Sequence, residues 1–297
     1  MPGHYPFGWL RHRLDLQDSH FELRTAHRFD EAVACPQREI TYTDSWFYPP
    51  LVAHDGILLP TGRFELPITH ILIAIGKPFD RAYGDFLILA LGFLLGLRLT
   101  IQGTGHLTAT AVRPGELVNF IPSDAELLTA LGCASDFWNR AAAEERTLAF
   151  AAIHTYLAAQ SYRHQYEQFA WQYMVLDNVH LLTWHRSVNY RRGFLSNFGN
   201  HGHRPPALSA EYGSPLPTSF RNANGECGRL THLRNELLHE ARWLGQPLGY
   251  AADATAHDII SDLKHFNSQL ILGFLGIACR FRASVYDRQM HALDLCV

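Results

Sequence analysis

The chain has 297 residues and a formal net charge of -3, with 47% hydrophobic and 18% charged residues. This composition predicts a folded protein with a hydrophobic core, and it excludes a disordered chain and a polycation that coats nucleic acid without specificity. The five cysteines include no C-x-x-C pair, which argues against a zinc cluster or a disulfide framework and favours a reducing compartment.

Residues 1–125 predict a mixed, strand-rich N-terminal domain. Its short segments with β-branched or aromatic residues, bounded by Pro, Gly or Asp, are 21–28, 39–47, 62–75 and 107–112. Between them the apolar run 86–97 predicts a buried helix over 84–99, because the run is too short to span a bilayer. The N-terminus lacks the apolar stretch of a signal peptide. We therefore expect a cytoplasmic protein without a membrane partner.

The pattern changes near Pro122 and predicts a helical domain over 126–297. Ser123, followed by acidic residues in the next turn, is a favourable helix start. The Ala-rich stretch 137–162, free of Gly and Pro, predicts a helix, and the stretch 166–186 predicts another. The side chains of the second helix that recur at helical spacing are Phe169, Tyr173, Leu176, His180 and Trp184.

Residues 186–229 interrupt the helices with many Gly, Pro, Asn and Ser residues, and we predict a long basic loop there. Six arginines against two glutamates give this segment a local charge of +4. Aromatic residues are interleaved with the arginines, a mixture that suits single-stranded RNA. A solvated loop of biased composition is an equal alternative. From this segment we predict RNA contacts by Arg191, Arg192 and Arg204.

The last two predicted helices cover 227–243 and 254–282, and Gly245 and Pro247 end the first of them. On a projection at about 100° per residue, the core face of that helix consists of Leu230, Leu233, Leu237, Ala241 and Leu244. The opposite, polar face consists of His232, Asn235, His239 and Arg242.

This helix carries the run R-N-x-x-x-H, formed by Arg234, Asn235 and His239. Arg234 and His239 point about 140° apart on the projection, so we expect that one helix does not aim both side chains at one atom. A second copy packed across a two-fold axis brings two of each into one cleft. Leu238, apolar within the polar cluster, is the expected contact for that partner helix. The sequence therefore predicts a homodimer with a composite active site.

The residue types of this motif suit RNA cleavage by the RNA's own 2'-hydroxyl. His239 moves a proton near neutral pH. Arg234 stabilises the charge that develops on the phosphate, and Asn235 orients these groups. Arg242 and His232 are predicted RNA contacts, and the reaction needs no metal or other cofactor. The alternative is an ordinary amphipathic helix whose polar residues face water.

Two features of the composition have plainer explanations. Only two of the 25 Lys and Arg residues are lysines, which the codon bias of a GC-rich genome explains as well as phosphate recognition by arginine does. The 18 histidines include the close pairs His201–His203 and His180–His185. Neither pair has Cys or Asp at the spacing of a zinc site, and we predict no metal site.

Residues 230–245, LTHLRNELLHEARWLG, and 258–276, DIISDLKHFNSQLILGFLG, resemble the HEPN superfamily. That family has an up-and-down helical bundle with an Arg, often followed by Asn, a few residues before a His. Arg234, Asn235 and His239 match this motif position by position. The resemblance implies a metal-independent ribonuclease that works as a dimer, in toxin–antitoxin, CRISPR-linked or abortive-infection defence.

Residues 86–99 and 169–184 are similar to two stretches of ApeA-like HEPN proteins, which place a separate N-terminal domain before the bundle. We therefore expect an α+β chain, with a mixed domain at 1–125 and a helical HEPN ribonuclease domain at 126–297 that contains the 186–229 loop. The expected partners are RNA, a second copy of the chain, and an inhibitory or trigger partner. The alternative function is a non-catalytic HEPN module that binds RNA, nucleotide or a protein partner.

Overall fold

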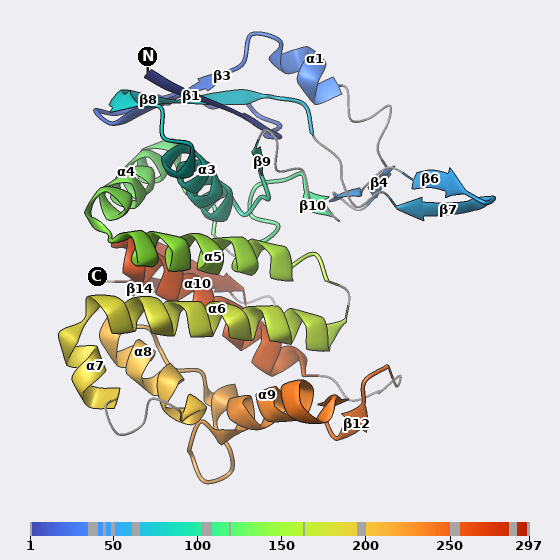
Figure 1. The fold of residues 1–297 in the computed structure, drawn as a ribbon, viewed down its shortest axis with the longest axis vertical. Coiled ribbons are helices and arrows are strands. Elements are labelled where there is room, and N and C mark those ends of the chain that lie inside the picture. Colours follow the sequence, from blue (N-terminus) through green and yellow to red (C-terminus); the bar gives the residue numbers. More distant parts are fainter. Residues whose placement is uncertain are drawn as a thin grey trace. The chain divides into compact units, whose positions relative to one another are not determined.

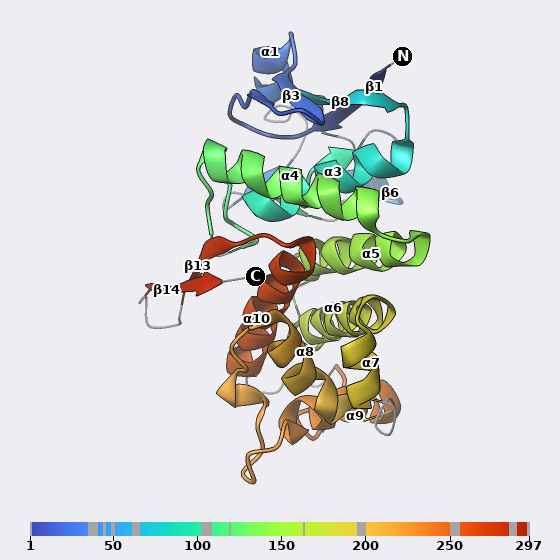
Figure 2. The ribbon, with the colours of Figure 1, turned by 90° about the vertical axis from the view of Figure 1, so that its left-hand side faces the viewer.

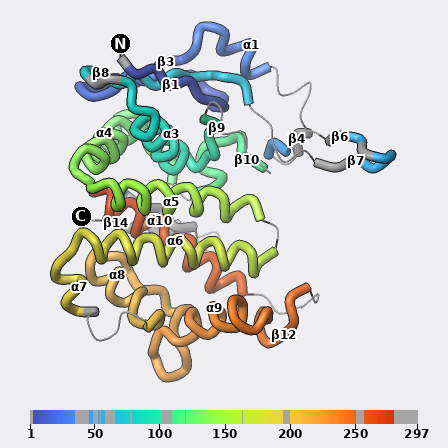
Figure 3. The backbone as a smooth tube through the Cα atoms, viewed as in Figure 1, coloured from blue at the N-terminus to red at the C-terminus, as the bar shows by residue number. Residues whose placement is uncertain are grey.

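The computed structural model describes residues 2–34, 41–43, 46–48, 51–60, 66–101, 109–118, 120–162, 164–194, 200–249, 256–284 and 290–295. The chain divides into two units, Met1–Asn139 and Arg140–Val297, and Figure 3 traces the backbone of each. The boundary differs from the expected one at 125/126, because helix α4 (Asp124–Arg140) lies almost wholly in the first unit. None of the helices in the described part of the chain has the length and apolarity that a bilayer crossing needs.

A five-stranded antiparallel sheet, in the order β2-β3-β8-β1-β9, organises the first unit (Figure 1). Its strands are β1 (Pro2–Gly8), β2 (Leu16–Gln17), β3 (Phe21–Thr25), β8 (His70–Pro78) and β9 (Thr100–Ile101). The smaller pieces are a three-stranded sheet and a hairpin. Their strands are β4 (Thr41–Thr43), β5 (Trp46–Tyr48) and β10 (Thr110–Ala111), then β6 (Leu51–His54) and β7 (Ile57–Pro60).

The predicted strand segments lie where strands occur, although each is longer than the strand that it contains. Segment 21–28 contains β3, 39–47 contains β4, 62–75 overlaps β8, and 107–112 contains β10. Residues 35–40, 44–45, 61–65 and 102–108 lie outside the described residues. Antiparallel sheets followed by helices confirm the predicted α+β class.

The apolar run of the first unit forms helix α3 (Arg81–Leu95), close to the predicted 84–99. The carboxylate of Asp80 accepts hydrogen bonds from two backbone N–H groups of its first turn, and Gly96 ends it in the left-handed conformation, with φ 63°. Gly84 lets the helix lie against β1, because a Cβ there would meet the ring of Tyr5 at 2.1 Å. Twelve of its fifteen residues are buried, so α3 is a core helix rather than an amphipathic one.

Helix α4 begins where the sequence predicts. The backbone N–H of Ser123 donates to Glu126 Oε2 at 2.8 Å, which satisfies a group at the start of the helix. The hydroxyl groups of Tyr83 on α3 and Ser135 on α4 lie 2.9 Å apart. The two helices and the sheet therefore form one core, to which the short helix α1 (Phe29–Ala34) contributes buried Phe29.

Three long helices form the second unit: α5 (Ala143–Ala159), α6 (Gln165–Arg186) and α10 (His257–Leu275). The shorter helices are α7 (Val188–Phe194), η1 (His201–His203), α8 (Arg204–Tyr212), η2 (Thr218–Phe220) and α9 (Gly228–Glu240). Helix α6 is the centre of the unit, because it contacts α5, α10, α8 and α9 (Figures 1 and 2).

The prediction of a long loop over 186–229 is wrong, because most of its described residues form short helices. Pro205 lies in the first turn of α8, where a missing backbone N–H costs little, and Gly213 ends that helix with φ 64°. Helices of seven and nine residues make too few turns to show a clear hydrophobic period. Residues 195–199 lie outside the described part of the chain.

The last predicted helix, 254–282, is right in its middle and wrong at its end. Helix α10 stops at Leu275, where Gly276 adopts φ 72° and bonds back to the last turn. The chain then forms the antiparallel hairpin β13 (Cys279–Ser284) and β14 (Met290–Leu295).

Candidate active site

The last turn of α9 carries His239, and the chain beyond it fixes where the helix stops. Ala241 adopts the left-handed conformation, with φ 51°, and its backbone N–H donates to Glu236 O. A short hairpin follows, formed by β11 (Arg242–Trp243) and β12 (Gln246–Pro247). Trp243 is buried, and its ring centroid lies 5.2 Å from that of Phe169 on α6. The hairpin therefore fastens the end of α9 to the central helix.

The prediction that this helix continues to residue 243 is wrong. Leu244 and Gly245 both have positive φ, 52° and 79°, so a tight turn forms directly after the helix. Arg242, expected on the polar face of the helix, lies on β11 instead. It is exposed, and its Nη1 lies 3.4 Å from Glu240 Oε2.

The three motif residues contact one another within one chain. Arg234 Nη1 lies 2.6 Å from His239 Nε2 and donates to Asn235 Oδ1 at 3.0 Å. A guanidinium group only donates hydrogen bonds, so His239 Nε2 is the acceptor. Nε2 of His239 therefore carries no hydrogen in this contact. The site holds a cation beside a proton-accepting nitrogen.

This contact overturns the expectation that one helix does not aim Arg234 and His239 at one atom. The helical projection gives the direction in which each side chain leaves the backbone. It does not include the reach of a long arginine side chain, which bends along the helix surface to its last turn. The geometric reason for a composite site in a dimer is therefore lost.

The buried face of α9 is rotated from the predicted one. Leu230 and Leu233 are buried as expected, but the third buried residue is Glu236, 8% exposed, while Leu237 is half-buried. Glu236 Oε1 lies 3.4 Å from Nε2 of His232, which is itself exposed. The sequence analysis assigned no role to Glu236, a buried acid directly beside the motif.

Two pairs of polar residues join α6 to the segment that precedes α9. Tyr173 and Asp177 lie one turn apart on α6, and His201 and Arg204 have similar spacing on η1 and α8. The Tyr173 hydroxyl lies 2.9 Å from His201 Nδ1. Arg204 Nη1 donates to Asp177 Oδ1 at 2.5 Å. Tyr173 and Asp177 share one face of α6, and the spacing of His201 and Arg204 matches theirs. The two contacts therefore hold η1 and the start of α8 against α6.

His201 is electrostatically linked to the motif. Burial lowers its pKa most, the positive charge of Arg204 lowers it further, and the carboxylate of Asp177 opposes both. The charges of Arg234 and His239 also lower the pKa of His201, although less. The His201 ring therefore lies within range of the motif residues and is neutral near pH 7.

A third polar pair lies farther along α6, where His180 contacts Tyr190. His180 Nδ1 lies 2.8 Å from the hydroxyl of Tyr190 on α7, and both side chains are buried. Burial lowers the pKa of His180 to about 4, and it raises that of the Tyr190 hydroxyl. The pair therefore stays uncharged at neutral pH.

The residues predicted to contact RNA do not form a single surface. Arg204 is 9% exposed and paired with Asp177, so it holds the fold together rather than facing solvent. Arg192 is exposed on α7, and Arg191 Nη1 donates to His185 O at 3.4 Å. Figure 1 shows α7 beyond the C-terminal end of α6, whereas the β11–β12 hairpin lies at the other end.

Sequence reasoning found the motif and missed its neighbours. His201 was weighed only as half of a metal-binding pair, and Tyr173 only as part of an apolar stripe. The available signal was their polarity at helical spacing, but nothing in the sequence pairs residues 28 positions apart. Among the described residues, no group of three or more His, Cys, Asp or Glu side chains is placed to hold a metal ion.

No family model, no curated protein and no solved structure matches this chain.

Proposed function

We propose that the chain is a metal-independent endoribonuclease that cleaves single-stranded or looped RNA. The observation that carries this proposal is the 2.6 Å contact between Arg234 Nη1 and His239 Nε2. It supplies a phosphate-binding cation and a proton acceptor within the reach of one phosphodiester. The resemblance of R-N-x-x-x-H to the HEPN motif supports the same chemistry. The proposed setting is the cytoplasm, in antiphage defence or a toxin-type system.

In the proposed reaction the 2'-hydroxyl of the RNA attacks the adjacent phosphorus. An arriving phosphate draws the Arg234 guanidinium away from His239, whose Nε2 then takes the hydroxyl proton. Arg234 stabilises the negative charge of the phosphorane, and Asn235 Oδ1 orients the guanidinium. The bond from phosphorus to the 5'-oxygen breaks, and that oxygen takes a proton from solvent. The products carry a 2',3'-cyclic phosphate and a 5'-hydroxyl.

His201 is a second candidate for the proton-accepting role. Its ring is neutral near pH 7 because burial and the nearby cations lower its pKa. The Tyr173 hydroxyl at Nδ1 fixes the ring, so Nε2 is the nitrogen left to face substrate. We assign Arg204 and Asp177 a positioning role, since their ion pair holds η1 against α6.

RNA contacts outside the motif are proposed for exposed Arg192 and Arg242 and for half-buried Arg191. His232, exposed on α9 two residues before Arg234, completes this set. Each would add phosphate contacts that position the strand without reading its bases.

A homodimer remains part of the proposal, and its support is now the exposed Leu238 rather than the helical projection. Leu238 is 56% exposed beside Asn235 and His239, and a large apolar side chain in that position suits contact with a second copy. An inhibitory or trigger partner that acts through the first unit is proposed as the means of control, because an unregulated ribonuclease is harmful to its own cell.

One observation favours a second candidate function, a non-catalytic HEPN module that binds RNA, nucleotide or a protein partner. Arg234 already occupies His239 Nε2, the atom that must accept the proton. If no ligand breaks this contact, the motif binds phosphate through Arg234 and cleaves nothing.

The experiment is cleavage of a 5'-labelled single-stranded RNA by the purified full chain, with the product ends identified by mass spectrometry. We expect cyclic phosphate ends, unchanged cleavage in EDTA, and a loss of about 10²–10⁴-fold in His239→Ala. His164→Ala, an exposed histidine before α6, is the matched control and should cleave normally. Cleavage at the full rate in His239→Ala contradicts the assignment. RNA binding without cleavage by wild type supports the non-catalytic module.

A further inference from the structure

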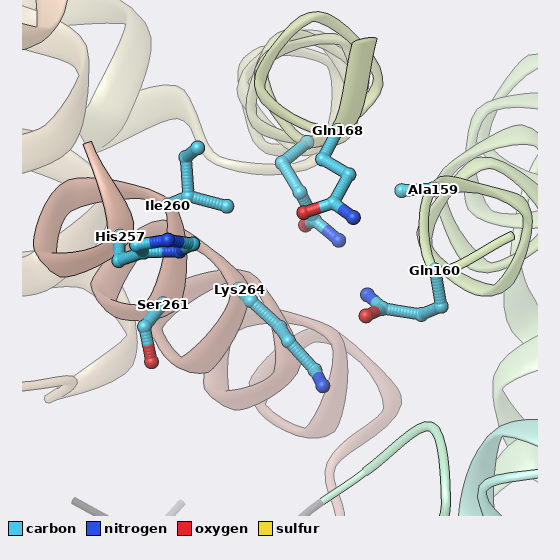
Figure 4. Close-up of a pocket in the computed structure, with 8 residues that line it drawn as sticks. Ala159, Gln160, Gln168, His257, Ile260, Ser261 and Lys264 are labelled. Atoms are coloured by element: carbon cyan, nitrogen blue, oxygen red, sulfur yellow. The ribbon is translucent and has the colours of Figure 1, made fainter. Parts of the chain in front are cut away.

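A pocket of about 190 Å³ lies within the second unit, between the C-terminal end of α5, the N-terminal part of α6 and the start of α10 (Figure 4). Its lining is largely polar. The lining residues are Ala159, Gln160, Gln168, Gln172, His257, Ile260, Ser261 and Lys264. None of them belongs to the motif on α9 or to the residues paired with it.

The sequence builds this pocket from helical spacing. Residues 257, 260, 261 and 264 fall on one face of the first two turns of α10, and residues 168 and 172 lie one turn apart on α6. Figure 4 shows the side chains of Gln160, Gln168 and Lys264 directed into the same space. The positive end of the α10 dipole adds to the positive charge of the lysine.

Lys264 has no acidic neighbour in the pocket. The lining contains amides, a hydroxyl and an imidazole, but no carboxylate. Burial lowers the pKa of Lys264 to about 8, and no neighbouring charge offsets that effect. Lys264 is half-buried, which favours a counter-charge near its ammonium group, and none of the described residues supplies one as an ion pair.

Gln172 forms a polar wall of the pocket. It is 1% exposed, and its Oε1 accepts a hydrogen bond from Asn267 Nδ2 at 2.8 Å. This contact to α10 holds the α6 side of the pocket in place.

The side-chain amides of Gln160 and Gln168 also line the pocket. Gln168 Nε2 donates to Tyr162 O at 2.7 Å, and Gln160 Nε2 lies 3.5 Å from Tyr156 O. One hydrogen of each amide nitrogen is used in this way, and the carbonyl oxygens of both side chains accept hydrogen bonds. The pocket therefore pairs a cation with neutral amides.

We propose that this pocket binds a small oxyanion, a carboxylate- or phosphate-bearing molecule that also carries hydroxyl or amino donors. Lys264 contacts the anionic group, and the carbonyl oxygens of Gln160 and Gln168 accept from its donors. The volume equals that of about six water molecules in the liquid, which admits a three- or four-carbon acid or sugar phosphate and excludes an RNA strand. The site does not depend on the proposed ribonuclease function.

The test uses the scarcity of lysine in this chain. Lys77 and Lys264 are its two lysines, so mass spectrometry follows the acetylation of each under limiting reagent. The probes are a matched series: glycerol, D-glycerate and glycerol 3-phosphate. At about ten times Kd, a bound probe should slow acetylation of Lys264 about tenfold and leave Lys77 unchanged. Glycerol, which has no charge, should protect neither lysine.

The two anions distinguish a carboxylate ligand from a phosphate ligand. Protection by D-glycerate alone indicates a carboxylate site, and protection by glycerol 3-phosphate alone indicates a phosphate site. Titration calorimetry should find binding in wild type and Lys77→Met, and none in Lys264→Met. Unchanged Lys264 acetylation with both anions overturns the proposal, as does equal binding by a folded Lys264→Met. If that variant does not fold, protection in the wild-type protein decides. Both measurements are repeated in His239→Ala, so they are independent of RNA cleavage.

Discussion

Helices α3 and α9 differ in what holds them in place. Helix α3 is buried along most of its length and has a side-chain cap at Asp80 and a glycine at its end. Helix α9 buries only Leu230, Leu233 and Glu236 of its thirteen residues, and no side chain caps its start. Its C-terminal end rests on the hairpin that carries Trp243.

This difference separates stability from function. The side chains of α3 are closely packed, so substitutions there should destabilise the fold. The exposed residues of α9 contribute little to stability, and they are therefore available for chemistry. Substitutions in the two helices should consequently change different measurements.

The largest expected effect is on the core of α3. Phe86 is fully buried, and its ring lies 4.7 Å from that of Trp138. Phe86→Ala should lower the free energy of unfolding by about 3–5 kcal/mol, because it leaves a cavity. Denaturant unfolding followed by circular dichroism measures it. Ile121→Ala, at a side chain that is 71% exposed, is the control and should change stability by about 0.5 kcal/mol or less. A similar loss in both variants would contradict the description of α3 as a core helix.

Arg234→Ala should show the opposite pattern. RNA cleavage should fall by about 10²–10³-fold, because the cation that stabilises the phosphorane is gone. The free energy of unfolding should change by no more than about 1 kcal/mol, since the side chain is half-buried in the middle of a surface helix. Single-turnover cleavage and denaturant unfolding of the same preparation provide both values. If Arg234→Ala loses activity because it unfolds, then α9 contributes to stability as α3 does, and the proposed difference between the two helices is contradicted.

The next prediction concerns pH and the buried His180. Its folded pKa is lowered to about 4, whereas an unfolded chain takes up this proton near pH 6.5. Its contribution to stability is therefore present above about pH 6.5 and is lost as the pH falls toward 4, by about 3 kcal/mol. The pKa of His70 in the first unit is lowered in the same way. The contribution of His180 to the pH dependence of stability is therefore obtained as the difference between wild type and His180→Gln. Unfolding curves at several pH values should show a shallower slope in the variant, and identical slopes would contradict the prediction.

The smallest expected effect is at Ala241. Its φ of 51° is unfavourable for a residue with a Cβ, and glycine adopts it readily. Ala241→Gly should raise the free energy of unfolding by about 0.5 kcal/mol. Ala207→Gly, within helix α8, should instead lower it by about 1 kcal/mol. Thermal unfolding of both variants tests the sign, and destabilisation by Ala241→Gly would show that the end of α9 is not strained.

The sequence predicts best those elements whose signals are local. The apolar run gives α3, the Ser123 start gives α4, and the motif gives a helix that carries Arg234, Asn235 and His239. These features depend on residues within a few turns of one another.

The missed features depend on distant contacts or on one backbone conformation. The ends of α9 and α10 were predicted too late in the chain, because Ala241 and Gly276 leave the helix before the expected stop signals. His201 joins the motif only through pairing with α6, which sequence periodicity does not encode. The side chain of Arg234 reaches farther than a helical projection allows.

Consecutive residues on α6 serve the two sites of the second unit. Gln172 lines the pocket beside Lys264, and Tyr173 holds the ring of His201. Their side chains leave the helix about 100° apart, so any rotation of α6 about its axis turns both through the same angle. A molecule that displaces Gln172 by rotating the helix therefore also shifts the hydroxyl that positions His201. A rotation of α6 would therefore move one wall of the pocket and the hydroxyl group at His201 together.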